Sequence, residues 1–434
     1  ACGEEMMSVR VLTTEAEFEA LQESWDELFH SNPNHSPYQS WRWNYTWWQH
    51  FGKPGRLRLL VAEENGRLIG IAPFCVRSRF RGWPLKHLSF IARKRAEYLD
   101  FIVRSGCEAA FFRELCEFLR AEPRGWRFIE LRDFSEQSSN LPFLLREIGR
   151  TFPALSLEST EICVTLPLPS TWDAFVATLG KRVRKDVGYD RRYLAKSFQV
   201  ELKIIADASA GGAAHADLLD LYRGRWRAEK GATQFDQADS AAFEHEIVTA
   251  FSALGWYRLY MLYVDGQAAA GLLGYVCANK FFGEVFVHAP QFHKYSVGNV
   301  LLGMAVEDCI AKGWSELDLA RGDEPYKHRW NGRIKRNYHL KIFPSRAALL
   351  LAALAEWIYE LGPRVTFLHR LRARYRGWRH GPASPPAAAR TTPEARSTPR
   401  RSGHAAAPEP SHAASLEPAP AECTLNPASA DPVE

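Results

Sequence analysis

Apolar residues recur along the chain with helical and strand-like spacing, and one succession of such segments occurs twice. Residues 57–73 consist of an apolar strand, an Asn-Gly turn and a second apolar strand, and residues 257–271 repeat this pattern around an Asp-Gly turn. Such dipeptides adopt the positive φ angles that a tight hairpin requires. The sequence therefore predicts two β-hairpins in equivalent positions of a duplicated unit.

Each predicted hairpin has helical patterns before it, and further strands, a helix and a final strand after it. In the first copy these helices and the final strand are 18–29, 41–51, 109–120 and 127–131, and in the second copy 218–226, 243–254, 300–311 and 315–319. Periods of 3.6 and 2 residues distinguish the two kinds of segment. The order predicts an α/β protein, an α+β mixed sheet, of two fused domains.

A turn of small and polar residues joins the strand 281–287 to the helix 300–311. It comprises His293, Lys294, Tyr295, Ser296, Val297, Gly298 and Asn299. Backbone N–H groups at such a turn, with a helix N-terminus behind them, form an anion site, and glycine lets a phosphate approach closely. The first copy has only Ser105-Gly106 at this place, so we expect only the second domain to bind a phosphate-bearing cofactor.

This turn resembles the acyl-CoA signature of the GNAT acyltransferases, a strand ending in Val-x-Pro and then Arg/Gln-x-x-Gly-x-Gly/Ala. Pro290 matches the proline. His293 falls on the Arg/Gln position, and Ser296 and Gly298 fall on the two glycines. Of these last three positions, those of His293 and Ser296 differ from the signature. The duplicated element order resembles the tandem FemAB/CelD-like (cellulose-biosynthesis-type) acyltransferases of bacteria over residues 9–343. Further matches are 36–40, 98–101 and, most specifically, 323–330.

The resemblance implies an enzyme that transfers an acyl group, in the first place acetyl, from acyl-CoA (acetyl-CoA) to an amine. The acceptor would be a small molecule or glycan precursor of surface-polysaccharide or cell-envelope metabolism. One alternative is a FemAB-like aminoacyltransferase that uses aminoacyl-tRNA. Another is a non-catalytic partner of a membrane polysaccharide-synthesis machine, which the altered signature favours.

Amide formation requires a base for the amine proton and a donor for the departing thiolate. Alternation along 281–288 is expected to place four residues on one side, namely Phe282, Glu284, Phe286 and His288. Glu284 is our first candidate base, because burial among aromatic rings would raise its pKa, and His288 is the second. By the resemblance, Tyr326 is the candidate acid. Asp323, Lys327 and Trp330 are candidates for the acceptor pocket. Each could instead be structural.

Changes in composition and pattern along the chain divide it into five predicted parts. The predicted parts are a leader (1–8), a degenerate GNAT-like domain (9–155), an acyl-CoA-binding domain (156–345), an apolar and basic helical segment (346–380) and a tail (381–434). The tail has no aromatic residue and is rich in proline, so we expect it to be disordered and dispensable for folding.

The remaining composition points to the cytoplasm. The 8 cysteines show neither paired nor metal-ligand spacing, so we expect thiols, a reducing compartment and no metal. The start of the chain is acidic and lacks the apolar region of a signal peptide. The net charge of +5 does not by itself indicate a nucleic-acid partner.

Two basic segments leave alternatives open. Residues 347–359 are apolar and too few to span a bilayer, and six arginines follow in 364–379 without an acidic residue. Residues 347–379 could contact an anionic inner membrane face peripherally, or form a helix packed on the second domain. A basic helix is also predicted from near Ser170 through Lys196. It is either a solvated face or a phosphate site. Few aromatic residues accompany it, which argues against a nucleic-acid partner, and tRNA is retained as an option only because the resemblance implies it.

Overall fold

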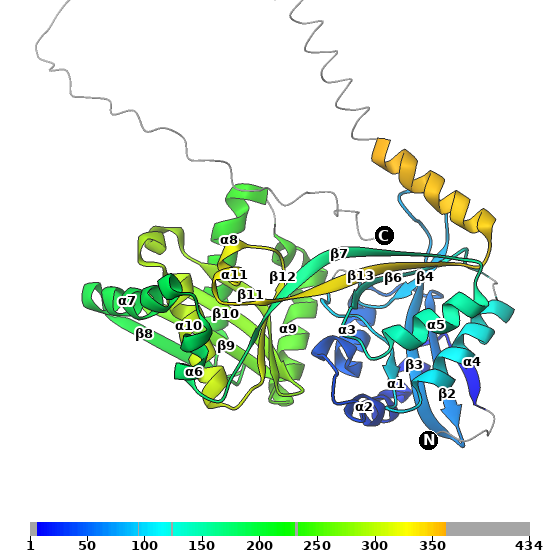
Figure 1. Ribbon diagram of the computed structural model, residues 1–434, viewed down its shortest axis with the longest axis horizontal. Helices are drawn as coiled ribbons and strands as arrows, with labels where there is room; N and C mark the ends of the chain where they lie inside the picture. Colours follow the sequence, from blue (N-terminus) through cyan, green and yellow to red (C-terminus); the bar gives the residue numbers. More distant parts are fainter. Residues whose placement is uncertain (1–6, 94, 123–124, 231–232, 362–434) are drawn as a thin grey trace, which may run out of the picture. The chain divides into compact units, whose positions relative to one another are not determined.

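Thirteen strands of the described residues form one mixed sheet in the computed structural model (Figure 1). The structure describes residues 7–93, 95–122, 125–230 and 233–361. The strands are β1 (Ser8–Leu12), β2 (Leu57–Glu64), β3 (Arg67–Arg77), β4 (His87–Phe90), β5 (Ile102–Val103), β6 (Ile129–Ser135), β7 (Ala154–Pro167), β8 (Val200–Ile205), β9 (Tyr257–Val264), β10 (Gln267–Cys277), β11 (Lys280–His288), β12 (Glu316–Arg321) and β13 (Arg333–Phe343). Their order across the sheet is β1-β2-β3-β4-β6-β13-β7-β12-β11-β10-β9-β8, and β5 pairs with β3.

Helices cover the sheet. They are α1 (Glu15–Ala20), α2 (Gln22–His30), α3 (Trp41–Phe51), α4 (Glu108–Ala121), α5 (Leu141–Thr151), α6 (Trp172–Thr178), α7 (Lys181–Ser197), α8 (Gly212–Lys230), α9 (Ala238–Ala253), α10 (Val297–Ala311) and α11 (Pro325–Arg329), with 3-10 turns η1 (Pro37–Gln39), η2 (Gln234–Asp236) and η3 (Pro290–Tyr295). A further helix covers 346–361. Among the described residues, no helix is both long and apolar enough to cross a membrane.

The predicted duplication is present in the structure. In the first half, α1 to α3 precede the β2–β3 hairpin, and β4, α4 and β6 follow it. In the second half, α8 and α9 precede the β9–β10 hairpin, and β11, α10 and β12 follow it. Both hairpin turns have positive φ at the predicted dipeptides, 52° and 73° at Asn65-Gly66 and 49° and 77° at Asp265-Gly266. In each half a strand that precedes α4 or α10 pairs in parallel with the strand that follows this helix, β4 with β6 and β11 with β12.

Two long strands connect the halves. β7 follows the first half in sequence, but it pairs with β12 of the second half through Cys163–Pro167. β13 follows the second half, but it lies between β6 and β7 and pairs with β6 from Asn337 to Ile342. β7 therefore extends across the domain boundary that we predicted between residues 155 and 156.

The halves also share a hydrophobic core. The largest cluster of buried apolar side chains contains residues of both halves, and a second cluster lies around α10 in the second half. Trp43 of α3 is the centre of the shared part, because its ring lies 5.3 Å from that of Phe243 and 6.0 Å from that of Phe251, both on α9. The aromatic-rich helix α3 thus packs against the second half.

Two sequence predictions need correction, and a third falls largely outside the described residues. The basic helix predicted from Ser170 to Lys196 is two helices, because the chain becomes extended at Leu179 and Gly180 between α6 and α7. The helix 346–361 packs on Phe80 and Phe128 of the first half as well as on Phe343 of β13, not on the second half alone. The rest of the segment 346–380 and the tail 381–434 lie outside the described residues, as do residues 1–6 of the leader.

Most cysteines of the described residues are free thiols. Five are buried and free, namely Cys75, Cys116, Cys163, Cys277 and Cys309. Cys107 is instead disulfide-bonded, which the sequence did not predict. Within the described chain, no group of His, Cys, Asp and Glu side chains is arranged to hold a metal ion.

Candidate active site

The two central strands of the second half separate at one point. The parallel pairing of β11 and β12 ends at Phe282 and Asp318. Immediately beyond, the register of β11 against β10 shifts, so that Gly283 and Val285 have partners on β10 and Glu284 has none. An extra residue of this kind is a β-bulge, which bends its strand and redirects a side chain. Glu284 therefore stands where β11 leaves β12.

Glu284 faces the first half of the chain. The hydroxyl of Tyr38, from η1, donates a hydrogen bond to Glu284 Oε2 at 2.9 Å. Burial raises the pKa of Glu284 to about 8, and the nearby carboxylates of Glu244 and Glu97 act in the same direction. The hydrogen bond from Tyr38 and the guanidinium of Arg95 oppose this rise. At neutral pH this carboxyl is therefore close to its titration range, which is the property required of a general base.

The bulge also overturns the alternation that we expected along β11. Phe282 lies with Glu284 on the side of the first half, where its ring is 6.3 Å from that of Tyr38. Val285 and Val287 belong to the same core, so Phe286 and His288 point to the other side, toward α10. The ring of Tyr326 lies 5.6 Å from that of Phe286. The candidate base Glu284 and the candidate acid Tyr326 thus lie on opposite faces of β11.

Several buried polar groups surround Glu284. Burial raises the pKa of Glu244, on α9, to about 7, and Arg95 opposes this rise. Three side-chain atoms here are buried and have no hydrogen-bond partner among the described residues, namely Trp43 Nε1, Glu244 Oε1 and Tyr275 Oη. Buried polar atoms nearly always have a partner. These atoms therefore mark a place for water or for the polar groups of a substrate.

Asp318 is the counterpart of Glu284 on β12. The hydroxyl of Tyr98 donates to Asp318 Oδ2 at 2.6 Å, and Lys335 Nζ lies 3.7 Å from the same oxygen. Burial raises the pKa of Asp318 to about 6, although Lys335 and Tyr98 oppose the rise. Sequence reasoning did not select Asp318, although a carboxylate between Leu317 and Leu319 on an apolar strand was a visible signal.

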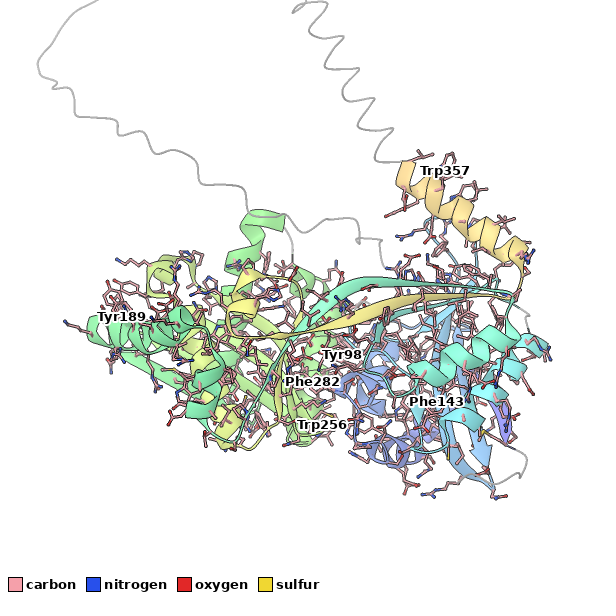
Figure 2. The ribbon with its side chains drawn as sticks, in the orientation of Figure 1. Tyr98, Phe143, Tyr189, Trp256, Phe282 and Trp357 are labelled. Atoms are coloured by element: carbon pink, nitrogen blue, oxygen red, sulfur yellow. The ribbon has the colours of Figure 1, made fainter. Side chains whose placement is uncertain are left out.

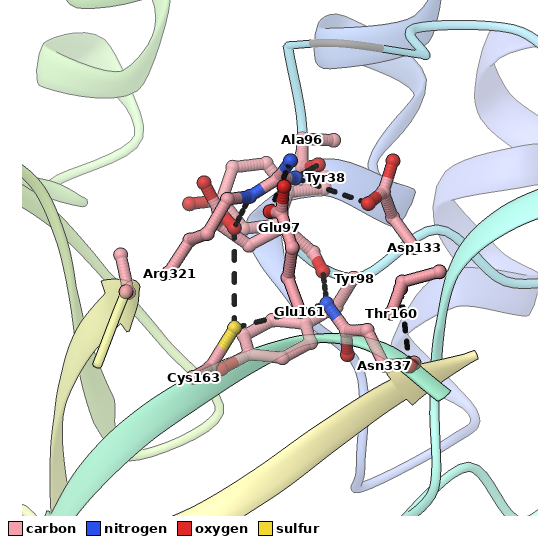
Figure 3. A network of polar contacts seen from close by, with 12 residues as sticks. Tyr38, Ala96, Glu97, Tyr98, Asp133, Thr160, Glu161, Cys163, Arg321 and Asn337 are labelled. Carbon is pink, nitrogen blue, oxygen red and sulfur yellow. Dashed lines mark hydrogen bonds and ion pairs between the residues drawn. The ribbon is translucent and has the colours of Figure 1, made fainter. Parts of the chain in front are cut away.

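An ionic cluster around Arg321 joins both halves next to this site (Figure 3). Its guanidinium lies 2.9 Å from Glu97, 3.1 Å from Asp133 and 2.6 Å from Glu161. Burial lowers the pKa of Arg321, but the three carboxylates outweigh this effect and raise it above its ordinary value. Glu97 and Asp133 belong to the first half, Glu161 to β7 and Arg321 to β12. The cluster therefore fixes the end of β12 against the first half.

The candidate phosphate-binding turn is η3 with the first turn of α10. Ser296 has φ +53°, and its side chain does not cap the N–H groups at the start of α10. The turn carries positive charge at Lys294, whose Nζ lies 4.8 Å from the ring centre of Tyr295. Asp190 of α7 accepts a hydrogen bond from the Ser296 side chain, and burial raises its pKa. A bound anion would compete with this carboxylate.

The other predicted residues of the turn lie close to β11. A Cβ atom on Gly298 would be 3.4 Å from His288 Nδ1, and the rings of His288 and His293 are 6.3 Å apart. Val297 is buried, and Asn299 lines a small pocket between α7, α10 and α11. His288 thus lies with the turn rather than with Glu284.

The three residues predicted for the acceptor pocket have partners within their own segment or half. Asp323, which is exposed, pairs with His328. Lys327 is buried, and its Nζ bonds to the carbonyl oxygens of Ala320, Arg321 and Gly322 and pairs with Glu324 at 2.9 Å. Trp330 is buried against Phe175 at 6.3 Å between ring centres. These contacts hold α11 in place. The structure shows no contact between any of these three residues and Glu284.

Helix α7 presents an aromatic and basic face beside the turn. Tyr189, labelled in Figure 2, stacks on Tyr193 at 5.7 Å, and Tyr193 stacks on Tyr295 at 5.4 Å. Tyr189 and Tyr193 are 53% and 41% exposed. Lys185, Arg192 and Lys196 share this face at helical spacing and are exposed. Stacked rings beside basic groups are typical of surfaces that bind nucleotides.

Comparisons with known proteins agree with the duplicated fold. A family model described as an acetyltransferase (GNAT) domain matches residues 181–328. No curated protein sequence matches the chain. Among solved structures, FemX aligns with a TM-score of 0.53 at 11% identity, over 80% of this chain and 100% of FemX.

Two further structures align less closely. The C-terminal domain of a putative lysylphosphatidylglycerol synthetase from Agrobacterium fabrum has a TM-score of 0.49 at 13% identity, over 80% of this chain and 97% of that domain. L-PGS from Bacillus licheniformis has a TM-score of 0.47 at 10% identity, over 79% and 96%. The family match and the FemX alignment agree with the duplicated element order. Residues 181–328 thus match an acetyltransferase (GNAT) domain model, and the fold of the described chain is similar to that of FemX.

Proposed function

We propose that the chain is an N-acyltransferase that transfers an acyl group from acyl-CoA to an amine, with Glu284 as general base and Tyr326 as general acid. The position of Glu284 is the observation that carries this proposal. Its carboxyl is held at the bulge where β11 and β12 separate, and burial brings its pKa to about 8. Such a group is able to accept the proton of an ammonium or amine near neutral pH.

The reaction uses both faces of β11. The amine nitrogen approaches from the side of Tyr38 and Glu284 and attacks the thioester carbonyl carbon. A C–N bond forms, the C–S bond breaks, and Glu284 takes the proton that the nitrogen loses. Tyr326, on the opposite face, donates its proton to the departing thiolate. Burial raises the pKa of Tyr326, so its hydroxyl is protonated before the transfer.

The donor's phosphates would bind at the start of α10. The N–H groups of its first turn and the ammonium of Lys294 favour an anion there, and Asp190 opposes it. The stacked tyrosines of α7 and Tyr295 adjoin the same turn, so they are in place for an adenine ring. From the resemblance stated above, we also propose an acceptor from surface-polysaccharide or cell-envelope metabolism.

Two substitutions with opposite expected effects test the donor site. Gly298→Asp adds a negative charge to the first turn of α10 and should weaken CoA binding at least tenfold. Asp190→Asn removes a negative charge but keeps an acceptor for Ser296, so it should strengthen binding. Isothermal calorimetry with CoA and acetyl-CoA measures both. Unchanged affinity in the two variants would place the donor elsewhere.

Tyr38→Phe tests the environment of the base. The variant keeps the ring but removes the hydroxyl that stabilises the charged form of Glu284, so the pKa of Glu284 should rise further. We expect the rate of acyl transfer to fall at pH 7 and to recover above pH 9, because more alkaline solution restores the carboxylate. The pH profile of kcat/KM shows this shift. A loss that is equal at every pH would mean that Tyr38 acts by another route.

A second candidate function is transfer of an aminoacyl group from charged tRNA, as the resemblance to FemAB-like proteins implies. The observation that favours it is the exposed face of Tyr189, Tyr193 and the basic residues of α7, which suits a single-stranded nucleic-acid end. A thermal-shift comparison of CoA thioesters with charged tRNA distinguishes the two donors. Stabilisation by the tRNA alone would replace acyl-CoA in the proposal.

A further inference from the structure

The helix over residues 346–361 has its larger apolar side chains on its outer face. Its small residues Ala348, Ala352 and Ala355 are buried against the sheet. The outer face carries Leu350, Leu351, Leu354 and Trp357, which are 70%, 47%, 49% and 58% exposed. Trp357 is labelled in Figure 2. A helix that only covers its own core has the reverse arrangement. A contiguous exposed apolar face of this kind indicates a binding surface.

The charged and polar residues of the helix lie away from this face. Glu356 is turned toward the sheet and pairs with Lys341 at 2.7 Å, and Tyr359 lies under the guanidinium of Arg81 at 4.8 Å. Arg346 and Glu360 stand at the two ends of the helix. Ile358 and Leu361, at helical spacing from Leu354, extend the apolar face. The face is therefore uncharged between these two ends.

The sequence that follows the helix identifies the chemistry of the partner. Residues 362–380 include six arginines and no acidic residue. Two copies of the chain would each carry this positive charge, which disfavours their association. An anionic lipid surface instead offers apolar material for the leucines and tryptophan and negative charge for the arginines.

We propose that the outer face of helix 346–361 binds the surface of an anionic lipid bilayer. The helix lies parallel to that surface, with its alanine face still on the sheet. This interaction does not depend on the transferase reaction, so either proposal can fail without the other.

Sedimentation of the full chain with vesicles tests this interaction. The protein should sediment with phosphatidylcholine vesicles that contain phosphatidylglycerol, and at least tenfold more weakly with phosphatidylcholine alone. Added salt should weaken the binding, because it screens the arginines. The triple variant Leu350→Ser, Leu354→Ser and Trp357→Ser should lose at least tenfold in partitioning to the anionic vesicles.

The matched control is Leu254→Ser, which alters an equally exposed leucine at the end of α9 and should bind as the wild type does. Equal melting temperatures would show that the variants are folded. Three results would overturn the proposal: no binding to the anionic vesicles, unchanged binding of the triple variant, or a lipid-free dimer that the triple variant dissociates. The last result would assign the face to self-association.

Discussion

Replacing Glu284 with Gln should lower the turnover of acyl transfer by about 10²–10⁴-fold, the range typical of general-base assistance. The amide keeps the shape of the side chain and an oxygen for the Tyr38 hydroxyl, but it cannot take a proton. The wild-type rate should rise with pH and level off above about 8, the pKa to which burial brings Glu284. The variant should lack this rise. Steady-state kinetics from pH 6 to pH 10 measures both effects.

The same variant should be more stable than the wild type in alkaline solution. The pKa of Glu284 is raised from 4.5 to about 8 in the folded protein, so the folded state retains a proton that the unfolded chain has lost. Its contribution to stability therefore declines as the pH rises from 4.5 through 8, and the neutral amide of the variant would show no such decline. The difference in melting temperature should grow toward pH 9 in favour of the variant.

His288→Gln provides the comparison on the same strand. If that variant loses the pH dependence while Glu284→Gln retains more than a third of the wild-type rate, His288 is the base. Retention of CoA affinity in Glu284→Gln would show that the loss concerns chemistry and not donor binding.

The second large effect is expected for Arg321→Met, which removes the cation of the cluster in Figure 3. Three carboxylates, those of Glu97, Asp133 and Glu161, would lose their common partner. Removing one partner of a buried ion pair typically costs about 3–5 kcal/mol. We expect the lower end of that range, because the side chain of Arg321 is 34% exposed.

The loss of stability in Arg321→Met should depend on pH. Burial already raises the pKa of Asp133, and Arg321 is the main group that opposes this rise. Without Arg321 that carboxyl should take up a proton more readily, which relieves the repulsion within the cluster at lower pH. Denaturation at pH 8 should therefore show a larger loss of stability than at pH 5.

Arg10→Met is the matched control, since its pair with Glu63 is at the surface and contributes less than about 1 kcal/mol. Equal losses in both variants would mean that the cluster contributes no more than a surface pair.

Local patterns were sufficient to predict the duplicated fold. The Asn-Gly and Asp-Gly turns, the helices before them and the order of strands after them depend on residues adjacent in sequence. The same holds for the candidate base, because Glu284 is a carboxylate on an apolar strand with aromatic neighbours. Its partners could not be predicted in this way. Tyr38 lies 246 residues from Glu284, and its role depends on how the two halves pack.

The bulge at Glu284 explains the main error in the site. Strict alternation placed His288 beside Glu284, but one inserted residue moves everything beyond it to the opposite face. A bulge leaves no reliable mark in an apolar strand. The acceptor residues proposed in 323–330 illustrate a second limit. A lysine in a matched motif suggested substrate binding, whereas Lys327 is occupied by three carbonyl oxygens of its own chain.

The exchange of β7 and β13 between the halves also has a consequence for biosynthesis. The ribosome completes the first half long before β13 is made, yet β6 obtains its neighbour on that side only when residues 337–342 arrive. Until then the nascent chain has an unpaired strand edge, the kind of surface that associates with other chains. The final closing step joins segments that are far apart in sequence and is therefore slow. Despite its two repeats, the chain therefore cannot complete the sheet of its first half before the second half has been made.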